Sequence, residues 1–140
     1  MLTNCIKQYP LTILTATTIC VLSVIPVPEV KMAEDIPLID KWVHFVMYGG
    51  LSAVTFFELY INYCKGTQNK KKREATIMML LCTFIVPSLY GGLLELVQKY
   101  LTTCRSGDWI DFIADAIGAA LGSLLGLIVV PHLVRKLTHM

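Results

Sequence analysis

The chain has 140 residues, 55% of them hydrophobic, and a formal net charge of +2. Its mean hydropathy of +0.63 is too high for a soluble globular domain, and its length is too short for two membrane domains. The composition therefore predicts a single all-α membrane domain over residues 1–140 and leaves no room for a separate soluble domain.

Four apolar segments follow in chain order, covering residues 9–27, 42–63, 75–97 and 109–130. Each is long enough to cross a hydrocarbon core about 30 Å thick, which takes about 20 helical residues. The first segment resembles a signal peptide because Lys7 precedes it, but its apolar run is longer than a usual signal core, so we expect it to be retained. The sequence thus predicts four transmembrane helices.

Basic residues predict the orientation of this bundle, because lysine and arginine concentrate in cytoplasmic loops. In a chain that crosses four times, one side receives Lys7, Lys65, Lys70, Lys71, Lys72, Arg73, Arg135 and Lys136. We therefore expect both termini to be cytoplasmic and the outer loops to be small. The basic loop suits lipid headgroups, and we expect no nucleic-acid partner. Glu58, near the same side, is expected to reach the headgroups.

The fourth segment has one acidic and glycine-rich face. Its carboxylates are spaced by three and four residues and therefore stack on one side of a helix: Asp108, Asp111 and Asp115. Glycines at four-residue spacing continue nearly the same face: Gly118, Gly122 and Gly126. Such glycines let another helix approach closely, either from the same chain or from a second copy in a homo-oligomer. This packing would keep the acidic face away from lipid.

The second and third segments carry polar faces at the same depth. These faces consist of Lys41, His44 and Tyr48 on the second segment, after Asp40 at the expected helix cap, and of Gly91, Glu95 and Gln98 on the third. Ionisable residues are costly inside a membrane and usually mark a function. We expect the three helices to present these groups to one shared cavity that opens outward.

This polar cluster has surplus negative charge. Its five carboxylates are Asp40, Glu95, Asp108, Asp111 and Asp115, and its three fixed cations are Lys41, Lys99 and Arg105. Because neighbouring carboxylates resist joint ionisation, the cluster must hold protons, use His44 as imidazolium or bind an external cation. A divalent metal is possible, with His44, Glu95 and Asp111 as candidate ligands, although no tight ligand motif marks it. We expect no other cofactor.

Three motifs in this order resemble the VanZ family: D-K-x-x-H-F-x-x-Y at 40–48, E-x-x-Q at 95–98, and R-x-x-D-x-x-D at 105–111. The resemblance spans roughly residues 10–130. It makes the following residues candidates for a ligand site: Asp40, Lys41, His44, Tyr48, Glu95, Gln98, Arg105, Asp108 and Asp111. The family usually has asparagine at the position of Asp115, which could replace an amide donor only when protonated.

The resemblance implies a bacterial envelope protein of the plasma (inner) membrane, related to a protein associated with teicoplanin resistance, and it implies no particular reaction. We expect the outer site to bind a lipid, a lipid-linked cell-wall precursor or a lipoglycopeptide. One alternative is a hydrolase or transferase at the membrane surface, with His44 and either Glu95 or Asp111 as acid and base. In another alternative, the polar groups only lock the three helices together.

Overall fold

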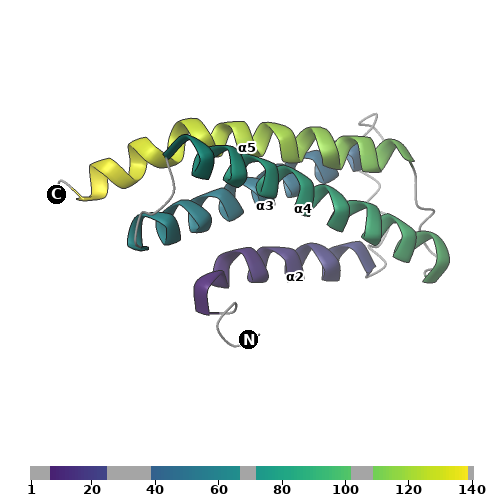
Figure 1. Ribbon diagram of the computed structural model, residues 1–140. Coiled ribbons are helices and arrows are strands. Elements are labelled where there is room, and N and C mark those ends of the chain that lie inside the picture. Colours follow the sequence, from purple (N-terminus) through teal and green to yellow (C-terminus); the bar gives the residue numbers. More distant parts are fainter. Residues whose placement is uncertain (1–6, 25–38, 67–71, 102–108, 139–140) are drawn as a thin grey trace.

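The computed structural model describes residues 7–24, 39–66, 72–101 and 109–138. Over these residues the chain is all-helical, as predicted, with α2 (Pro10–Val24), α3 (Ile39–Lys65), α4 (Lys72–Leu101) and α5 (Trp109–Thr138). Successive helices run in alternating directions (Figure 1). One end of the bundle contains the last residues of α2 and α4 and the first residues of α3 and α5, and we call it the His44 end.

Three helices extend beyond the apolar segments that predicted them. The segment expected at 109–130 continues to Thr138, and the one expected at 75–97 runs from Lys72 to Leu101. Basic residues in the last turns, Lys99 in α4 and Arg135 in α5, interact favourably with the negative end of the helix dipole. Hydropathy identifies only the apolar part of each helix. The helix itself continues into the polar residues on either side, because these residues also favour helical backbone.

The packing of α3 against α5 is the most extensive helix contact in the bundle. The stripe glycines Gly118, Gly122 and Gly126 face α3, where they lie against, in that order, Phe45, Gly49 and Phe56. A Cβ at Gly118 or Gly122 would run into a backbone carbonyl of α3, so only glycine permits this approach. The stripe therefore packs within the chain, which was one of the two expected arrangements. Self-association stays a prediction.

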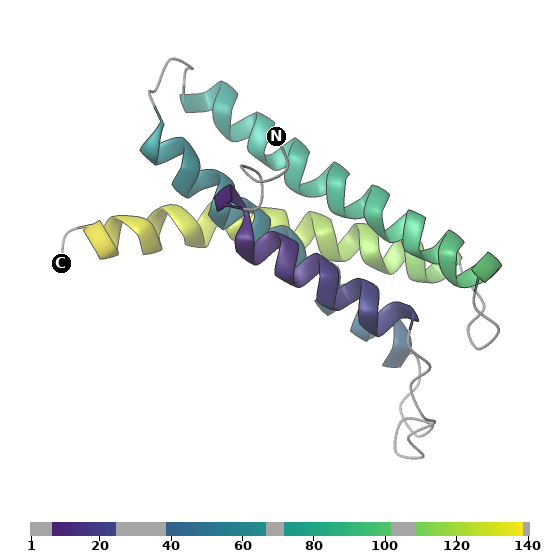
Figure 2. The ribbon, with the colours of Figure 1, turned by 90° about the horizontal axis from the view of Figure 1, so that it is seen from below.

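The remaining helices complete the bundle around this pair. α4 contacts both α3 and α5, whereas α2 contacts α3 and α4. Figures 1 and 2 show α2 on the opposite side of the bundle from α5. One buried apolar cluster, in the half nearer the His44 end, joins α2, α3 and α4: Ile19, Tyr48, Leu51 and Leu94. A second, in the other half, joins α3, α4 and α5: Phe56, Ala75, Met79 and Val130.

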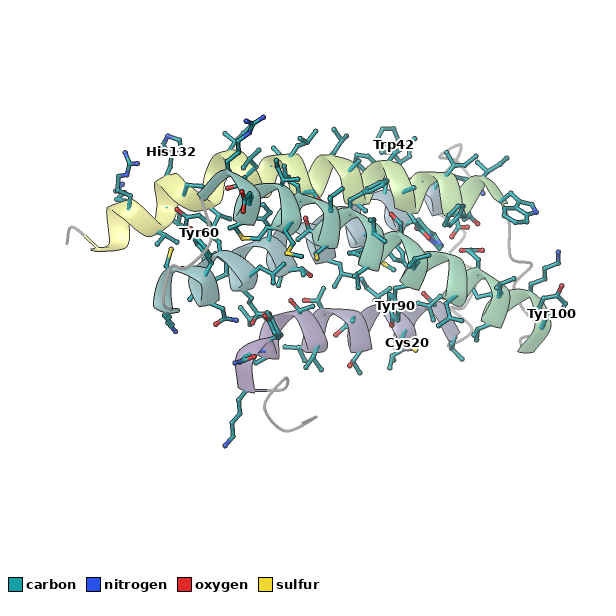
Figure 3. The ribbon with its side chains drawn as sticks, in the orientation of Figure 1. Cys20, Trp42, Tyr60, Tyr90, Tyr100 and His132 are labelled. Atoms are coloured by element: carbon teal, nitrogen blue, oxygen red, sulfur yellow. The ribbon has the colours of Figure 1, made fainter. Side chains whose placement is uncertain are left out.

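The outside of the bundle is apolar. Two described helices are long and apolar enough to cross a membrane, over Arg73–Tyr100 and Trp109–Lys136. Only 33% and 39% of their most apolar windows are buried, so both helices turn most of their apolar surface outward, unlike the core helix of a soluble protein. Figure 3 shows these outward side chains along the bundle, with Trp42 and Tyr100 toward the His44 end and His132 toward the other.

Glu58 does not reach toward headgroups, which corrects the expectation from its position in the sequence. Its side chain is only 6% exposed and accepts hydrogen bonds from the backbone N–H groups of Leu11 (2.8 Å) and Thr12 (2.9 Å). The first amides of a helix lack partners within that helix and carry partial positive charge. Glu58 therefore caps the start of α2 from the neighbouring helix α3.

The close approach of α3 and α5 can be tested with two glycine substitutions. Gly122→Ala should lower the free energy of unfolding by about 1–3 kcal/mol, because the added methyl group meets the Gly49 backbone. Gly50→Ala is the matched control, since nothing lies within 4 Å of a Cβ at that position. Denaturant unfolding of the detergent-solubilised protein measures both. Equal stability of the two variants would contradict the packing.

Removal of the charge at Glu58 should loosen the first turn of α2. Glu58→Gln leaves one acceptor oxygen for two amide donors, so hydrogen exchange at Leu11 and Thr12 should accelerate by about tenfold or more. Glu74→Gln, an exposed carboxylate in the first turn of α4, is the control. If Leu11 and Thr12 exchange no faster in Glu58→Gln than in Glu74→Gln, the cap contributes little to the stability of the first turn of α2.

Candidate functional site

His44 lies at the centre of the polar residues contributed by three helices. Its side chain, on α3, is buried, and its Nδ1 atom lies 2.9 Å from Asp115 Oδ1 on α5 and 3.7 Å from Glu95 Oε1 on α4. Asp115 is fully buried and Glu95 is 8% exposed. We call these three residues the deep trio. Asp115, the residue at which the chain departs from the motif pattern, is thus in hydrogen-bond contact with His44.

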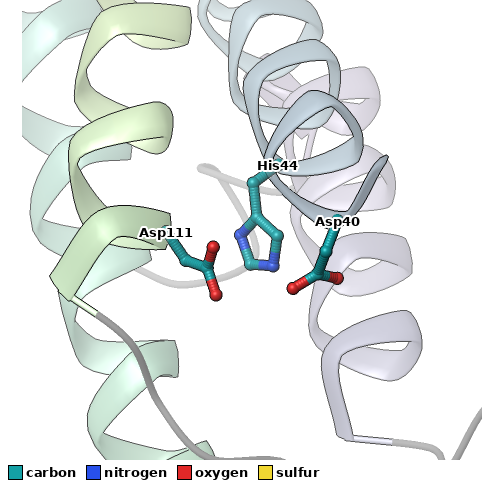
Figure 4. A group of neighbouring side chains, drawn as sticks. All are labelled: Asp40, His44 and Asp111. Carbon is teal, nitrogen blue, oxygen red and sulfur yellow. The ribbon is translucent and has the colours of Figure 1, made fainter. Parts of the chain in front are cut away.

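A second acidic group lies on the more exposed side of the same imidazole. Lys41 Nζ is 2.6 Å from Asp111 Oδ1, an ion pair between the first turns of α3 and α5. Potential ligand atoms of Asp40, His44 and Asp111 lie within 4.8 Å of one another. Figure 4 shows the Asp40 and Asp111 carboxylates on opposite sides of the His44 ring. One imidazole is therefore surrounded by four carboxylates.

Two other motif residues make contacts that hold the bundle around this cluster. Tyr48 is buried and its ring is nearly parallel to that of His44, with centroids 6.3 Å apart. Gln98 Nε2 donates a hydrogen bond of 2.9 Å to the carbonyl of Ser23 in α2. Tyr90, which the motifs did not include, donates a 2.7 Å hydrogen bond to the Ala16 carbonyl. The hydrogen bonds of Gln98 and Tyr90 attach α2 to α4. Arg105 and Asp108 lie outside the described residues.

Gly91 makes room for the deepest carboxylate. A Cβ added to Gly91 would lie 2.5 Å from Asp115 Oδ2, so any larger residue would displace this side chain. The same oxygen is buried and has no hydrogen-bond partner among the described residues. Sequence reasoning identified Gly91 only as part of the polar face of its segment. Its position one turn before Glu95 was the available signal, but the contact with Asp115 depends on how α4 is rotated against α5.

The structure divides the expected metal ligands into two sets. Candidate donor atoms of His44, Glu95 and Asp115 lie within 4.8 Å of one another, and so do those of Asp40, His44 and Asp111. The sequence had grouped Asp111 with Glu95, whereas in the fold Asp115 takes that position. The buried set contains two carboxylates and one imidazole, a combination of donors that a divalent metal can use.

A groove of about 380 Å³ runs along α4 and α5 beside this cluster. Its walls are mainly apolar, and they include Leu89, Leu93, Leu96, Trp109 and Phe112. Glu95 and Lys99 are its charged members. Because Glu95 also belongs to the deep trio, the apolar groove and the buried polar cluster share one carboxylate.

No protein-family model, curated protein or solved structure matches the chain. The resemblance of the three motifs to the VanZ family stays a prediction, and the chemistry of the site is interpreted from its own geometry.

The Lys41–Asp111 pair can be tested with a double-mutant cycle. Lys41→Met leaves the buried Asp111 carboxylate without its ammonium partner and should lower the free energy of unfolding by about 1–3 kcal/mol. The double variant Lys41→Met/Asp111→Asn should recover part of this loss, because the uncompensated charge is removed. Losses that simply add in the double variant would show that the two side chains do not interact.

Proposed function

We propose that the chain is a multi-pass protein of the plasma membrane whose four helices span the bilayer, with the His44 end facing outward and both termini in the cytoplasm. The outward apolar surfaces of α4 and α5 support insertion. α3 has 27 residues, which at 1.5 Å per residue gives about 40 Å, and it packs against both of these helices. A helix held between two spanning helices shares their depth in the membrane.

The orientation is supported by the distribution of basic residues. Lys65, Arg73, Arg135 and Lys136 belong to the end of the bundle opposite His44. Basic residues concentrate on the cytoplasmic side, so this end should face the cytoplasm and the acidic cluster should lie near the outer surface.

Within this protein, we propose that the His44 end binds a lipid or a lipid-linked molecule. The observation that carries this proposal is the groove along α4 and α5, because its apolar walls suit a hydrocarbon chain and its Glu95 carboxylate belongs to the deep trio. A headgroup held there would meet carboxylates suited to hydroxyl or amine donors, and Lys41 and Lys99 suited to an anionic linkage.

Lipid-linked cell-wall precursors and lipoglycopeptides combine these features, since each joins a hydrocarbon chain to a head rich in hydroxyl and amine groups. The resemblance to the VanZ family favours such a ligand and an accessory role in teicoplanin resistance. The chain would then act by holding the ligand at the outer surface of the membrane.

An enzymatic role at the same place is the second candidate. Asp115 lies 2.9 Å from His44 Nδ1, so a carboxylate fixes the orientation of the imidazole, as in many general bases. The other side of the ring faces Asp40, near the more exposed rim of the cluster. A hydrolase or transferase acting on a lipid headgroup could use this arrangement, with Glu95 or Asp111 as the partner acid.

The groove can be tested without altering the polar cluster. Leu96→Trp fills the groove from an exposed position on α4 and should lower the amount of copurifying lipid by about tenfold, equivalent to about 1.4 kcal/mol of binding free energy. Leu81→Trp is the matched control, because Leu81 is similarly exposed on the same helix and does not line this groove. Mass spectrometry of the lipid extracted from each purified protein measures the effect.

Equal lipid content in the two tryptophan variants would contradict lipid binding in the groove. The teicoplanin tolerance of a susceptible bacterium that produces each variant gives the cellular readout. A new product mass after incubation with bacterial lipid extract, lost in His44→Gln, would favour the enzyme over the binding protein.

A further inference from the structure

We propose that His44, Glu95 and Asp115 together bind one divalent transition-metal ion inside the bundle. This site shares Glu95 with the proposed lipid groove but does not rest on lipid binding, because its three donors belong to α3, α4 and α5 and require no other molecule. The inference rests on donor geometry, on charge and on one unpartnered buried oxygen.

The spacing of the donor atoms fits a common ion. Zn²⁺ and similar ions bind imidazole nitrogen and carboxylate oxygen at about 2.0–2.2 Å, so neighbouring ligand atoms lie roughly 3–3.5 Å apart. His44 Nδ1 lies 2.9 Å from Asp115 Oδ1 and 3.7 Å from Glu95 Oε1. All three donor atoms lie within 4.8 Å of one another, so side-chain adjustments would bring them to one ion. Three protein ligands leave a position open for water or a substrate.

Charge balance favours the same occupant. Lys41 pairs with Asp111 nearer the rim, whereas Glu95 and Asp115 face one imidazole in the buried part of the cluster. A divalent cation would bring the formal charge of His44, Glu95 and Asp115 to zero while the imidazole stays neutral. Neutrality matters here because the surrounding helices are apolar and isolated buried charges are costly.

A second, independent observation comes from Asp115 itself. This residue is fully buried, yet within the described part of the chain its Oδ2 atom has no hydrogen-bond partner. Buried carboxylate oxygens without partners are rare, and a bound ion is one of the arrangements that satisfy them. The room around this oxygen exists only because position 91 is glycine, since a Cβ there would lie 2.5 Å from it. The fold therefore leaves room beside Gly91 for an Asp115 oxygen that no described residue binds.

The surroundings of His44 suit a metal ligand. Histidine ligands are commonly oriented by a carboxylate on their other ring nitrogen. Asp40 lies on the side of the ring opposite Asp111, as Figure 4 shows, and its carboxylate belongs to the same 4.8 Å group. Asp40, in the first turn of α3, is thus a positioning residue for the imidazole.

The donor set also indicates the class of metal. One imidazole with two carboxylates suits Zn²⁺, Mn²⁺ or Fe²⁺, whereas Ca²⁺ and Mg²⁺ prefer sites made of oxygen alone. We therefore expect Zn²⁺ or Mn²⁺ to bind more tightly than Mg²⁺.

The experiment uses the full chain in detergent, treated with a chelator and then titrated with Zn²⁺ or Mn²⁺ by calorimetry, with metal content measured by mass spectrometry. Wild-type protein should bind one ion per chain. Glu95→Gln and Asp115→Asn should each weaken binding by about 100-fold or more, and Asp40→Asn by about 10–100-fold. His132→Gln and Glu74→Gln, at the other end of the bundle, should bind as the wild type does.

Several results would overturn the site. One is a folded wild-type chain that binds no stoichiometric ion, and another is tight binding retained in both Glu95→Gln and Asp115→Asn. A third is metal binding that is lost in Asp111→Asn and kept in Asp115→Asn, because the ion would then belong to the set formed by Asp40, His44 and Asp111. Circular dichroism checks that each variant folds, and the wild-type stoichiometry decides if none does. Metal binding and lipid content are measured separately. A protein that binds the metal ion but carries no lipid would therefore refute the proposed function and leave the metal site standing.

Discussion

The close contact between α3 and α5 is the constraint on which the rest of the structure depends. Gly118 and Gly122 bring the backbone of α5 against that of α3 at Phe45 and Gly49. His44 is next to Phe45 on α3, and Asp115 lies three residues before Gly118 on α5. The contact that joins the two helices therefore also places the His44 imidazole 2.9 Å from the Asp115 carboxylate. The glycines therefore determine the geometry of the polar cluster as well as the packing. A wider separation of these helices would pull the two side chains apart.

Around this contact, polar groups are arranged by depth. The pair formed by Lys41 and Asp111 lies nearer the rim, where the lysine side chain is still 22% exposed. Below it, the deep trio is enclosed by apolar helices whose outer surfaces are apolar as well. An apolar environment strengthens every charge interaction within the cluster and raises the cost of any charge left unpaired. The arrangement therefore couples the packing of three helices to the charge balance of the cluster.

α2 is joined to this core largely through polar contacts with its backbone. Glu58 of α3 accepts from its first amides, while Tyr90 and Gln98 of α4 donate to the carbonyls of Ala16 and Ser23. Glu58 satisfies amides that have no partner within α2, and the three side chains together hold the start, the middle and the end of this short helix. Two motif residues thus serve the packing beside His44: Gln98 attaches α2 to α4, and Tyr48 belongs to the buried cluster that joins α2, α3 and α4.

The sequence by itself determined the helical architecture, the gathering of ionisable residues at one end, and the shared face of the carboxylates and glycines on the last helix, because these follow from hydropathy and from 3.6 residues per turn. Only the tertiary structure decided that the glycines face α3, that Asp111 pairs with Lys41 while Asp115 pairs with His44, and that Glu58 caps α2. The spacing of residues within a helix gives their face but not the rotation of that helix about its axis or its offset against a neighbour. Those two quantities are set by contacts between segments far apart in the chain, and they decide which carboxylate meets which partner.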